Sequence, residues 1–127
     1  KIDEAQALRE NASPANFGGE VRIQRLVGAE QSGEVEILVV YFSAGGRTRP
    51  HVHVRDQVLQ IVSGQGFVAT ETERRLVGPG DVITIPAGAW HWHGATRDTP
   101  MCHLSIKQPG PTDWSVDERN WATYGDS

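Results

Sequence analysis

Apolar residues along this chain gather in short runs that glycine and proline interrupt. The longest run, residues 37–42, has the length of one strand and is rich in β-branched and aromatic side chains. Turn signals separate the runs, as at Gly45 with Gly46 and at Gly78 with Pro79. The pattern predicts strands at residues 21–27, 34–42, 57–63, 66–70, 75–77, 81–85, 90–93 and 101–107.

The segments outside these strands carry weaker signals. Residues 1–11 predict a short helix, because Ile2, Ala5 and Leu8 recur at a spacing of three. Residues 13–19 predict a loop, and the tail after Pro109 predicts one helical turn. Short strands separated by turns are typical of an all-β sandwich or barrel, and 127 residues are enough for one such domain. We therefore expect a single all-β domain over residues 1–127.

Composition and charge exclude several classes of function. The net charge is −4, and no cluster of Lys and Arg marks a nucleic-acid or membrane surface. No apolar run approaches the roughly 18–20 residues that cross a bilayer, and the first ten residues are too polar for a secretory signal. A single cysteine excludes an internal disulfide. These features predict a cytoplasmic protein with a small-molecule substrate.

The strongest chemical signal is the placement of the histidines, which all lie within residues 51–103. His51 and His53 are two residues apart, so on a strand they face the same side. Gln57 follows four residues later, and His91 comes after another turn. Three imidazoles and an amide oxygen can hold one divalent ion and leave positions open for a substrate, as catalytic sites do. The alternatives are a barrel without metal, or Gln57 only as a hydrogen-bonding neighbour of the site.

These positions resemble the two sequence motifs of the cupin superfamily. The first, Gly-x5-His-x-His-x3-Glu-x6-Gly, fits residues 45–64 at every spacing, with Gln57 in place of Glu. The second, Gly-x5-Pro-x-Gly-x2-His-x3-Asn, fits residues 80–95, with Ala95 in place of Asn. The resemblance implies the cupin double-stranded β-helix, a jelly-roll barrel with its core at about residues 20–108.

Gln57 changes the expected chemistry of the metal. With three neutral imidazoles and a neutral amide, a divalent ion keeps its charge of +2, whereas a glutamate would reduce it to +1. The higher charge makes the ion a stronger Lewis acid and disfavours its oxidation. The sequence therefore favours acid–base or lyase chemistry over redox chemistry. One ion per chain is expected; Mn, Fe, Ni, Co and Zn all accept histidine ligands.

Two further histidines are expected to face the same cavity. His93 lies two residues after His91, and alternation along the last strand places His103, Ser105 and Lys107 on one face. Imidazoles that stand beside a metal can take and return protons during catalysis. The alternatives are His93 as a fourth imidazole ligand or a structural hydrogen-bonding residue, and His103 and Lys107 as solvent-facing residues.

A narrower resemblance adds roles to these positions. The runs GGRTRPHVHVRDQ, HWHGA and MCHLSI are similar to the small bacterial manganese-dependent cupins with hydroxynitrile lyase activity. The resemblance implies manganese bound by three histidines and one glutamine, with Thr48, His93 and His103 as catalytic pocket residues. The chain departs from that family at Lys107, where a glutamine lines the pocket, and at Leu38, where a smaller residue stands. If Lys107 points inward, it can hold a departing anion.

Several other residues have a structural and a functional interpretation. Trp90 and Trp92 should face away from the metal, where they either pack in the outer layer or form the contact of an expected homodimer. Arg47 and Arg49 lie near the barrel mouth, where they either attract an anionic substrate or are solvated. Cys102 neighbours His103, but adjacent strand residues face opposite sides, so we expect a buried thiol.

Three functions remain open on the sequence. The first is a metal-dependent lyase or related acid–base enzyme acting on a small hydroxylated or carbonyl compound. The second is a metal-dependent dioxygenase or other oxidoreductase of the cupin type. The third is a cupin that binds a ligand without catalysis. The glutamine and the two additional histidines favour the first.

Overall fold

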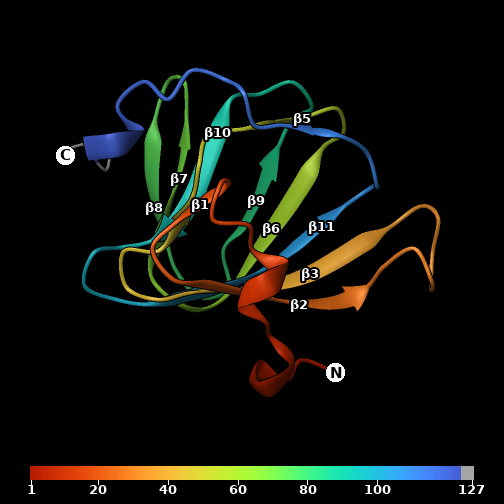
Figure 1. Ribbon diagram of the computed structural model, residues 1–127. Coiled ribbons are helices and arrows are strands. Elements are labelled where there is room, and N and C mark those ends of the chain that lie inside the picture. Colours follow the sequence, from red (N-terminus) through yellow and green to blue (C-terminus); the bar gives the residue numbers. More distant parts are fainter. Residues whose placement is uncertain (124–127) are drawn as a thin grey trace.

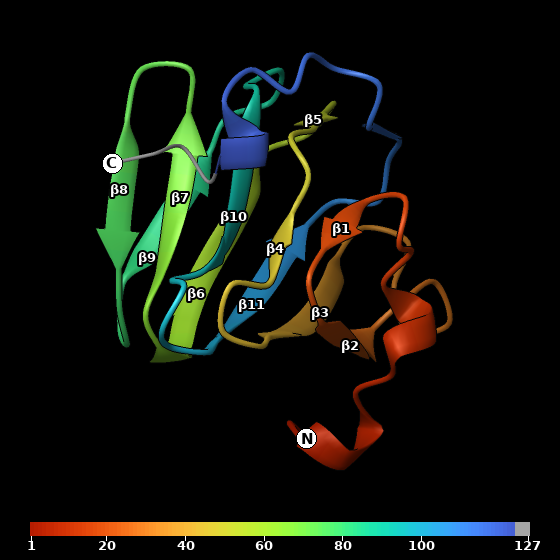
Figure 2. The same cartoon turned by 60° about the vertical axis from the view of Figure 1, so that its left-hand side comes forward.

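The computed structural model describes residues 1–123 and shows two antiparallel sheets that face each other (Figures 1 and 2). The first sheet has the order β2 (Val21–Val27), β3 (Glu36–Phe42), β11 (Met101–Lys107), β6 (Gln57–Gly64) and β9 (Val82–Ile85). The second has the order β1 (Phe17–Gly18), β4 (Arg47–Thr48), β10 (His91–Ala95), β7 (Gly66–Thr70) and β8 (Arg74–Val77). A separate pair joins β5 (Val52–His53) to β12 (Thr112–Asp113). The predicted all-β jelly-roll barrel is confirmed.

The apolar core lies between the two sheets. Its residues come from alternate positions of the strands, since every second side chain faces inward. The fully buried members include Phe42, Leu59, Ile61 and Ile85. This core fills one part of the barrel and leaves the polar inward positions to form the histidine site described below.

Gly64, the last residue of the first sequence motif, closes the turn between β6 and β7. Its φ of 78° is unfavourable for other residues, and a Cβ at this position would lie 1.8 Å from the carbonyl oxygen of Pro100. The turn therefore requires glycine, which explains this motif position by geometry alone.

The sequence-based prediction was wrong for the N-terminal segment. Residues 1–11 form two 3-10 turns, η1 (Glu4–Gln6) and η2 (Arg9–Asn11), rather than one helix. Between them, Leu8 pairs with Ile23 as an isolated bridge. Pairing with β2 holds this backbone extended, and so few residues form an isolated helix poorly.

The prediction also missed the shortest strands. The expected loop at residues 13–19 contains β1, and β4, β5 and β12 were not foreseen. Each has two residues, too few to show an alternating pattern. The predicted helical turn of the tail is present as η3 (Trp121–Thr123), a 3-10 turn.

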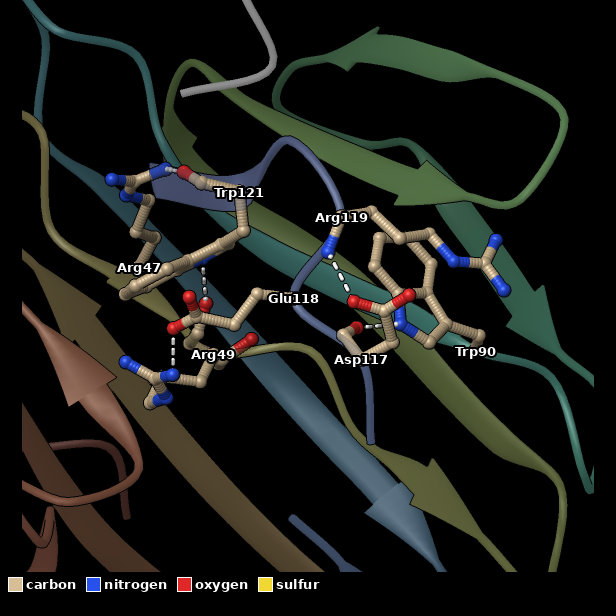
Figure 3. A network of polar contacts seen from close by, with 8 residues as sticks. Arg47, Arg49, Trp90, Asp117, Glu118, Arg119 and Trp121 are labelled. Atoms are coloured by element: carbon tan, nitrogen blue, oxygen red, sulfur yellow. Dashed lines mark hydrogen bonds and ion pairs between the residues drawn. The ribbon is translucent and has the colours of Figure 1, made fainter. Parts of the chain in front are cut away.

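The C-terminal segment, defined here as residues 108–123, ends on the outer face of the second sheet, where Asp117, Glu118 and Trp121 lie (Figure 3). Trp121 packs in one buried cluster with Trp90 and Trp92. The indole nitrogen of Trp121 donates to the Thr48 carbonyl over 2.7 Å, and that of Trp90 donates to the Asp117 carbonyl over 2.6 Å. Of the two interpretations of Trp90 and Trp92, packing within the chain is the one the structure shows. The homodimer stays a prediction that no longer rests on these tryptophans.

Arg47 and Arg49 bind this segment as well. Arg47 donates to the Trp121 carbonyl, and Arg49 forms an ion pair with Glu118. Both guanidinium groups lie over the Trp121 ring, at 4.2 and 4.7 Å from its centroid. Neither side chain is among the described residues that line the histidine cavity, and both contact the C-terminal segment instead.

Within residues 1–123, no helix has the length and apolar character needed to cross a bilayer.

Candidate metal centre

A cavity of about 220 Å³ opens between the sheets and collects the predicted site residues. His51, His53, His93 and His103 line it, together with Gln57. His91 is fully buried behind this wall, and the other four histidines are at most 6% exposed. The barrel therefore brings all five imidazoles into one buried region.

His51, His53 and His91 converge because of backbone pairing. His51 and His91 exchange two main-chain hydrogen bonds, of 2.9 and 3.1 Å, as an isolated bridge. Their ring centroids lie 4.2 Å apart, and the His53 ring lies 4.8 Å from His51 and 5.1 Å from His91. The three rings therefore lie close together, but the three histidines whose nitrogens all lie within 4.8 Å of one another are His51, His91 and His93. The ligand set expected from the two motifs stays a prediction.

The outer nitrogens of these rings are held by hydrogen bonds. Nδ1 of His51 lies 2.7 Å from the Arg49 carbonyl, and Nδ1 of His91 lies 2.9 Å from the Ala89 carbonyl. A carbonyl can only accept, so each Nδ1 carries the hydrogen and each Nε2 presents a lone pair. Metal-binding histidines have this arrangement, in which the second ring nitrogen is anchored.

His53 is anchored differently. Its Nδ1 lies 3.0 Å from the hydroxyl of Thr112 on β12, and its buried Nε2 has no hydrogen-bond partner among residues 1–123. A buried polar atom without a partner has a free-energy cost that a ligand can remove. The site therefore contains, beside the other two imidazoles, a buried ring nitrogen that a metal ion could bind.

Gln57, the fourth ligand expected from the first motif, lies beside these imidazoles. Its amide nitrogen donates to the Ser105 hydroxyl over 2.8 Å, which turns its Oε1 to within 3.2 Å of His91 Nε2. Because His91 Nδ1 keeps the ring hydrogen, the two facing atoms both present lone pairs. A cation bound by both atoms would remove this repulsion. The residues present therefore fit a divalent ion.

Burial keeps the five histidines uncharged. Desolvation lowers the pKa values of His53, His91 and His103 to about 4, and it lowers those of His51 and His93 well below the usual range. All five are therefore neutral at pH 7. Neutral imidazole is the form that binds a metal or accepts a proton.

His93 stands between the ligand candidates and His103. One nitrogen each of His51, His91 and His93 lie within 4.8 Å of one another, so these three buried histidines could bind a metal. His93 Nδ1 also lies 2.9 Å from His103 Nε2, and His93 Nε2 has no partner. The structure thus places His93 both as a possible ligand and as a member of a histidine pair, the two roles that the sequence left open.

The remaining predicted residues also line the cavity. Thr48 is buried and accepts the main-chain N–H of His93 over 3.2 Å. Lys107 lines the cavity, its Nζ lies 3.2 Å from Glu36, and its side chain is 11% exposed. Leu38 lies on the same wall. The alternation predicted for β11 is confirmed, since Ser105 and Lys107 share the cavity face with His103.

Sequence reasoning missed several residues that line the cavity, among them Thr112 and Trp114. The Trp114 ring packs against His51, with centroids 4.3 Å apart and planes at 30°. Both residues follow a turn and belong to a two-residue strand or its end, where no periodicity exists to place them. Their only signal was that the tail contains an aromatic residue.

Cys102 faces away from the cavity, as expected. Its thiol is buried, and desolvation raises its pKa to about 11. A thiol with this pKa carries almost no thiolate at neutral pH.

Comparison with known proteins identifies the fold family. The Cupin domain profile matches residues 38–107. The chain is 38% identical over 93 residues to the (R)-mandelonitrile lyase of Granulicella tundricola, an alignment covering 72% of this chain and 71% of that enzyme. It superposes on the crystal structure of a cupin-like protein from Thermotoga maritima with a TM-score of 0.79 at 32% identity, covering 88% of this chain and 90% of that one.

A dioxygenase is also among the relatives. The acireductone dioxygenase of a Sulfurihydrogenibium species is 30% identical over 83 residues, which is 61% of this chain. The chain spans less than half of that enzyme, since the alignment covers 46% of it.

Proposed function

This chain belongs to the cupin family, and we propose that it is a metal-dependent enzyme with lyase-type acid–base chemistry on a small hydroxylated or carbonyl compound. One observation carries the proposal: an uncharged ligand set and a hydrogen-bonded histidine pair share one buried cavity. The likeness to an (R)-mandelonitrile lyase makes a hydroxynitrile the first substrate to test.

The ligands we propose are His51, His53, Gln57 and His91, holding one divalent ion per chain. Support comes from the anchored Nδ1 atoms, the unpartnered Nε2 of His53 and the lone pairs that face each other between Gln57 and His91. We favour manganese because of the resemblance to manganese-dependent cupins; Fe, Ni, Co and Zn fit the same donors. When bound, the ion supplies Lewis acidity toward a substrate oxygen.

His93 and His103 are the proposed proton-transfer groups. The unpartnered Nε2 of His93 can accept the proton of a substrate hydroxyl, and its Nδ1 contacts His103 Nε2 over 2.9 Å. As the hydroxyl proton leaves, the C–C bond to the nitrile carbon breaks and its electron pair departs with cyanide. The carbonyl product forms, and the same proton is returned to cyanide, so the reaction has no net proton change.

Thr48 and Lys107 have supporting roles in this proposal. The Thr48 oxygen accepts a hydrogen bond from the His93 backbone, which leaves its own O–H available to a substrate oxygen. Lys107 lines the cavity, where its ammonium group can attract the departing anion. Its pairing with Glu36 reduces this attraction and fixes the side chain.

A cupin-type dioxygenase is the second candidate, favoured by the relationship to an acireductone dioxygenase. It would need the ion to change its oxidation state, which an uncharged ligand set disfavours. The third candidate, ligand binding without turnover, leaves the histidine pair without a role.

One experiment separates the three candidates. The purified protein is stripped of metal, reloaded with Mn²⁺, and assayed for cleavage of (R)-mandelonitrile to benzaldehyde and hydrogen cyanide, in air and under argon. Lyase chemistry predicts metal-dependent turnover at equal rates in both atmospheres. Turnover that stops under argon would establish the dioxygenase, and no turnover of any hydroxynitrile by metal-loaded protein would contradict the lyase proposal.

A further inference from the structure

The C-terminal segment reaches the candidate metal centre from beyond β11, the last long strand of the barrel. It leaves β11, runs along one end of the barrel and continues to the outer face near β10 (Figure 1). On the way, β12 pairs with β5, which places Thr112 opposite His53 and Asp113 opposite Val52. None of these C-terminal residues falls within the part of the chain that the family profile matches, residues 38–107.

The pairing delivers a hydroxyl to a ligand candidate. The Thr112 hydroxyl lies 3.0 Å from Nδ1 of His53, a residue only 6% exposed. His51 and His91 use main-chain carbonyls of the residues two before them, which exist in any sequence. Of the three histidines proposed as ligands, His53 is the one for which the described residues place a side chain at Nδ1, so a single substitution can remove its anchor.

We propose that Thr112 is a positioning residue for the metal centre. Its hydroxyl accepts the Nδ1 hydrogen of His53, which holds the ring and leaves Nε2 with the lone pair that binds the ion. Without this acceptor the buried N–H loses its partner, and the ring can rotate or take the other tautomer. The inference rests on the proposed function, because it assigns Thr112 to the metal site of that proposal.

Contacts that do not involve Thr112 hold the segment in place. Trp121 donates to the Thr48 carbonyl, Trp90 donates to the Asp117 carbonyl, and Arg49 pairs with Glu118 (Figure 3). Replacing Thr112 by valine keeps the shape and the β-branched backbone preference of the side chain and removes only the hydroxyl. We therefore expect the variant to keep the segment docked and to change the environment of His53 alone.

The test is the affinity of metal-free protein for Mn²⁺, measured by calorimetric titration and repeated with Co²⁺. The variants are Thr112→Val, Thr112→Ser and, as a matched control, Thr84→Val. Thr84 lies on the edge strand β9, is exposed and does not line the cavity. Thermal unfolding of each metal-free variant reports whether the substitution affects the fold itself.

We expect Thr112→Val to bind Mn²⁺ about 10- to 100-fold more weakly, the usual effect of losing a partner of a ligating histidine. Thr112→Ser should restore affinity close to that of the wild type, because it returns the hydroxyl, and Thr84→Val should bind as the wild type does. A Thr112→Val protein with unchanged affinity would refute the positioning role and leave the proposed function intact. A wild-type protein that binds neither ion would overturn both.

Discussion

Acidification of the metal-free protein gives the most quantitative test of the buried histidine cluster. Burial lowers the pKa values of His91 and His103 from 6.5 to about 4, and both side chains are completely buried. Between pH 6.5 and pH 4 the unfolded chain therefore binds more protons than the folded one. The free energy of unfolding must fall as the pH falls through this range, because stability rises with pH wherever the unfolded state binds more protons.

The size of the effect follows from the pKa difference. At pH 5 each of these two histidines reduces stability by about 2 kcal/mol relative to pH 7, or about 4 kcal/mol together. This is a large part of the roughly 5–15 kcal/mol that stabilises a typical domain. Urea unfolding at pH 7 and pH 5 measures the loss directly, as a lower midpoint at an unchanged slope.

A variant provides the control for this prediction. His103→Gln removes one titrating group, so its stability should depend on pH less steeply by about 2 kcal/mol between pH 7 and pH 5. Its absolute stability can differ from that of the wild type without affecting this comparison. Equal urea midpoints for the metal-free wild type at both pH values would refute the argument that the imidazoles are neutral because they are buried.

Three further predictions concern activity, metal binding and the tail. His103→Gln should keep its bound Mn²⁺ by elemental analysis and lose about 10²- to 10⁴-fold in kcat; unchanged turnover would remove His103 from the proton path. Gln57→Glu should bind Mn²⁺ about tenfold more tightly and cleave a hydroxynitrile more slowly, because the carboxylate reduces the charge of the site and weakens the Lewis acid. Calorimetric titration measures the affinity and steady-state kinetics measure kcat. Faster cleavage would contradict the charge argument. Trp121→Ala should lower the free energy of unfolding by about 3–5 kcal/mol, as for other buried aromatic residues. The reason is that Trp121 is 8% exposed and packs in one cluster with Trp90. A loss below about 1 kcal/mol would show that the tail does not stabilise the barrel.

The residues of β11 show which features of the site the local sequence pattern predicts. The side-chain period of a strand is two, so the positions of His103, Ser105 and Lys107 alone implied that they share one face. All three line the cavity. The same rule placed Cys102 on the opposite face, where it is buried away from the site.

Arg47 and Arg49 show which features the local sequence pattern does not predict. Their position near the barrel mouth was evident, but both are bound by the C-terminal segment about 70 residues later in the chain. The hydroxyl of Thr112 at His53 and the ring of Trp114 at His51 are further examples. No periodicity within a two-residue strand can predict such partners.

The sequence by itself determined the strand pattern and the all-β class, because periodicity and turn residues act over a few neighbouring positions. The resemblance of its two motifs to the cupin superfamily added the jelly-roll barrel and the proposed metal ligands. Only the tertiary structure decided that His93 contacts His103, that Gln57 turns its oxygen toward His91, and that the C-terminal segment anchors His53. Those contacts join segments distant in the chain, so they exist only once both sheets and the tail have packed together.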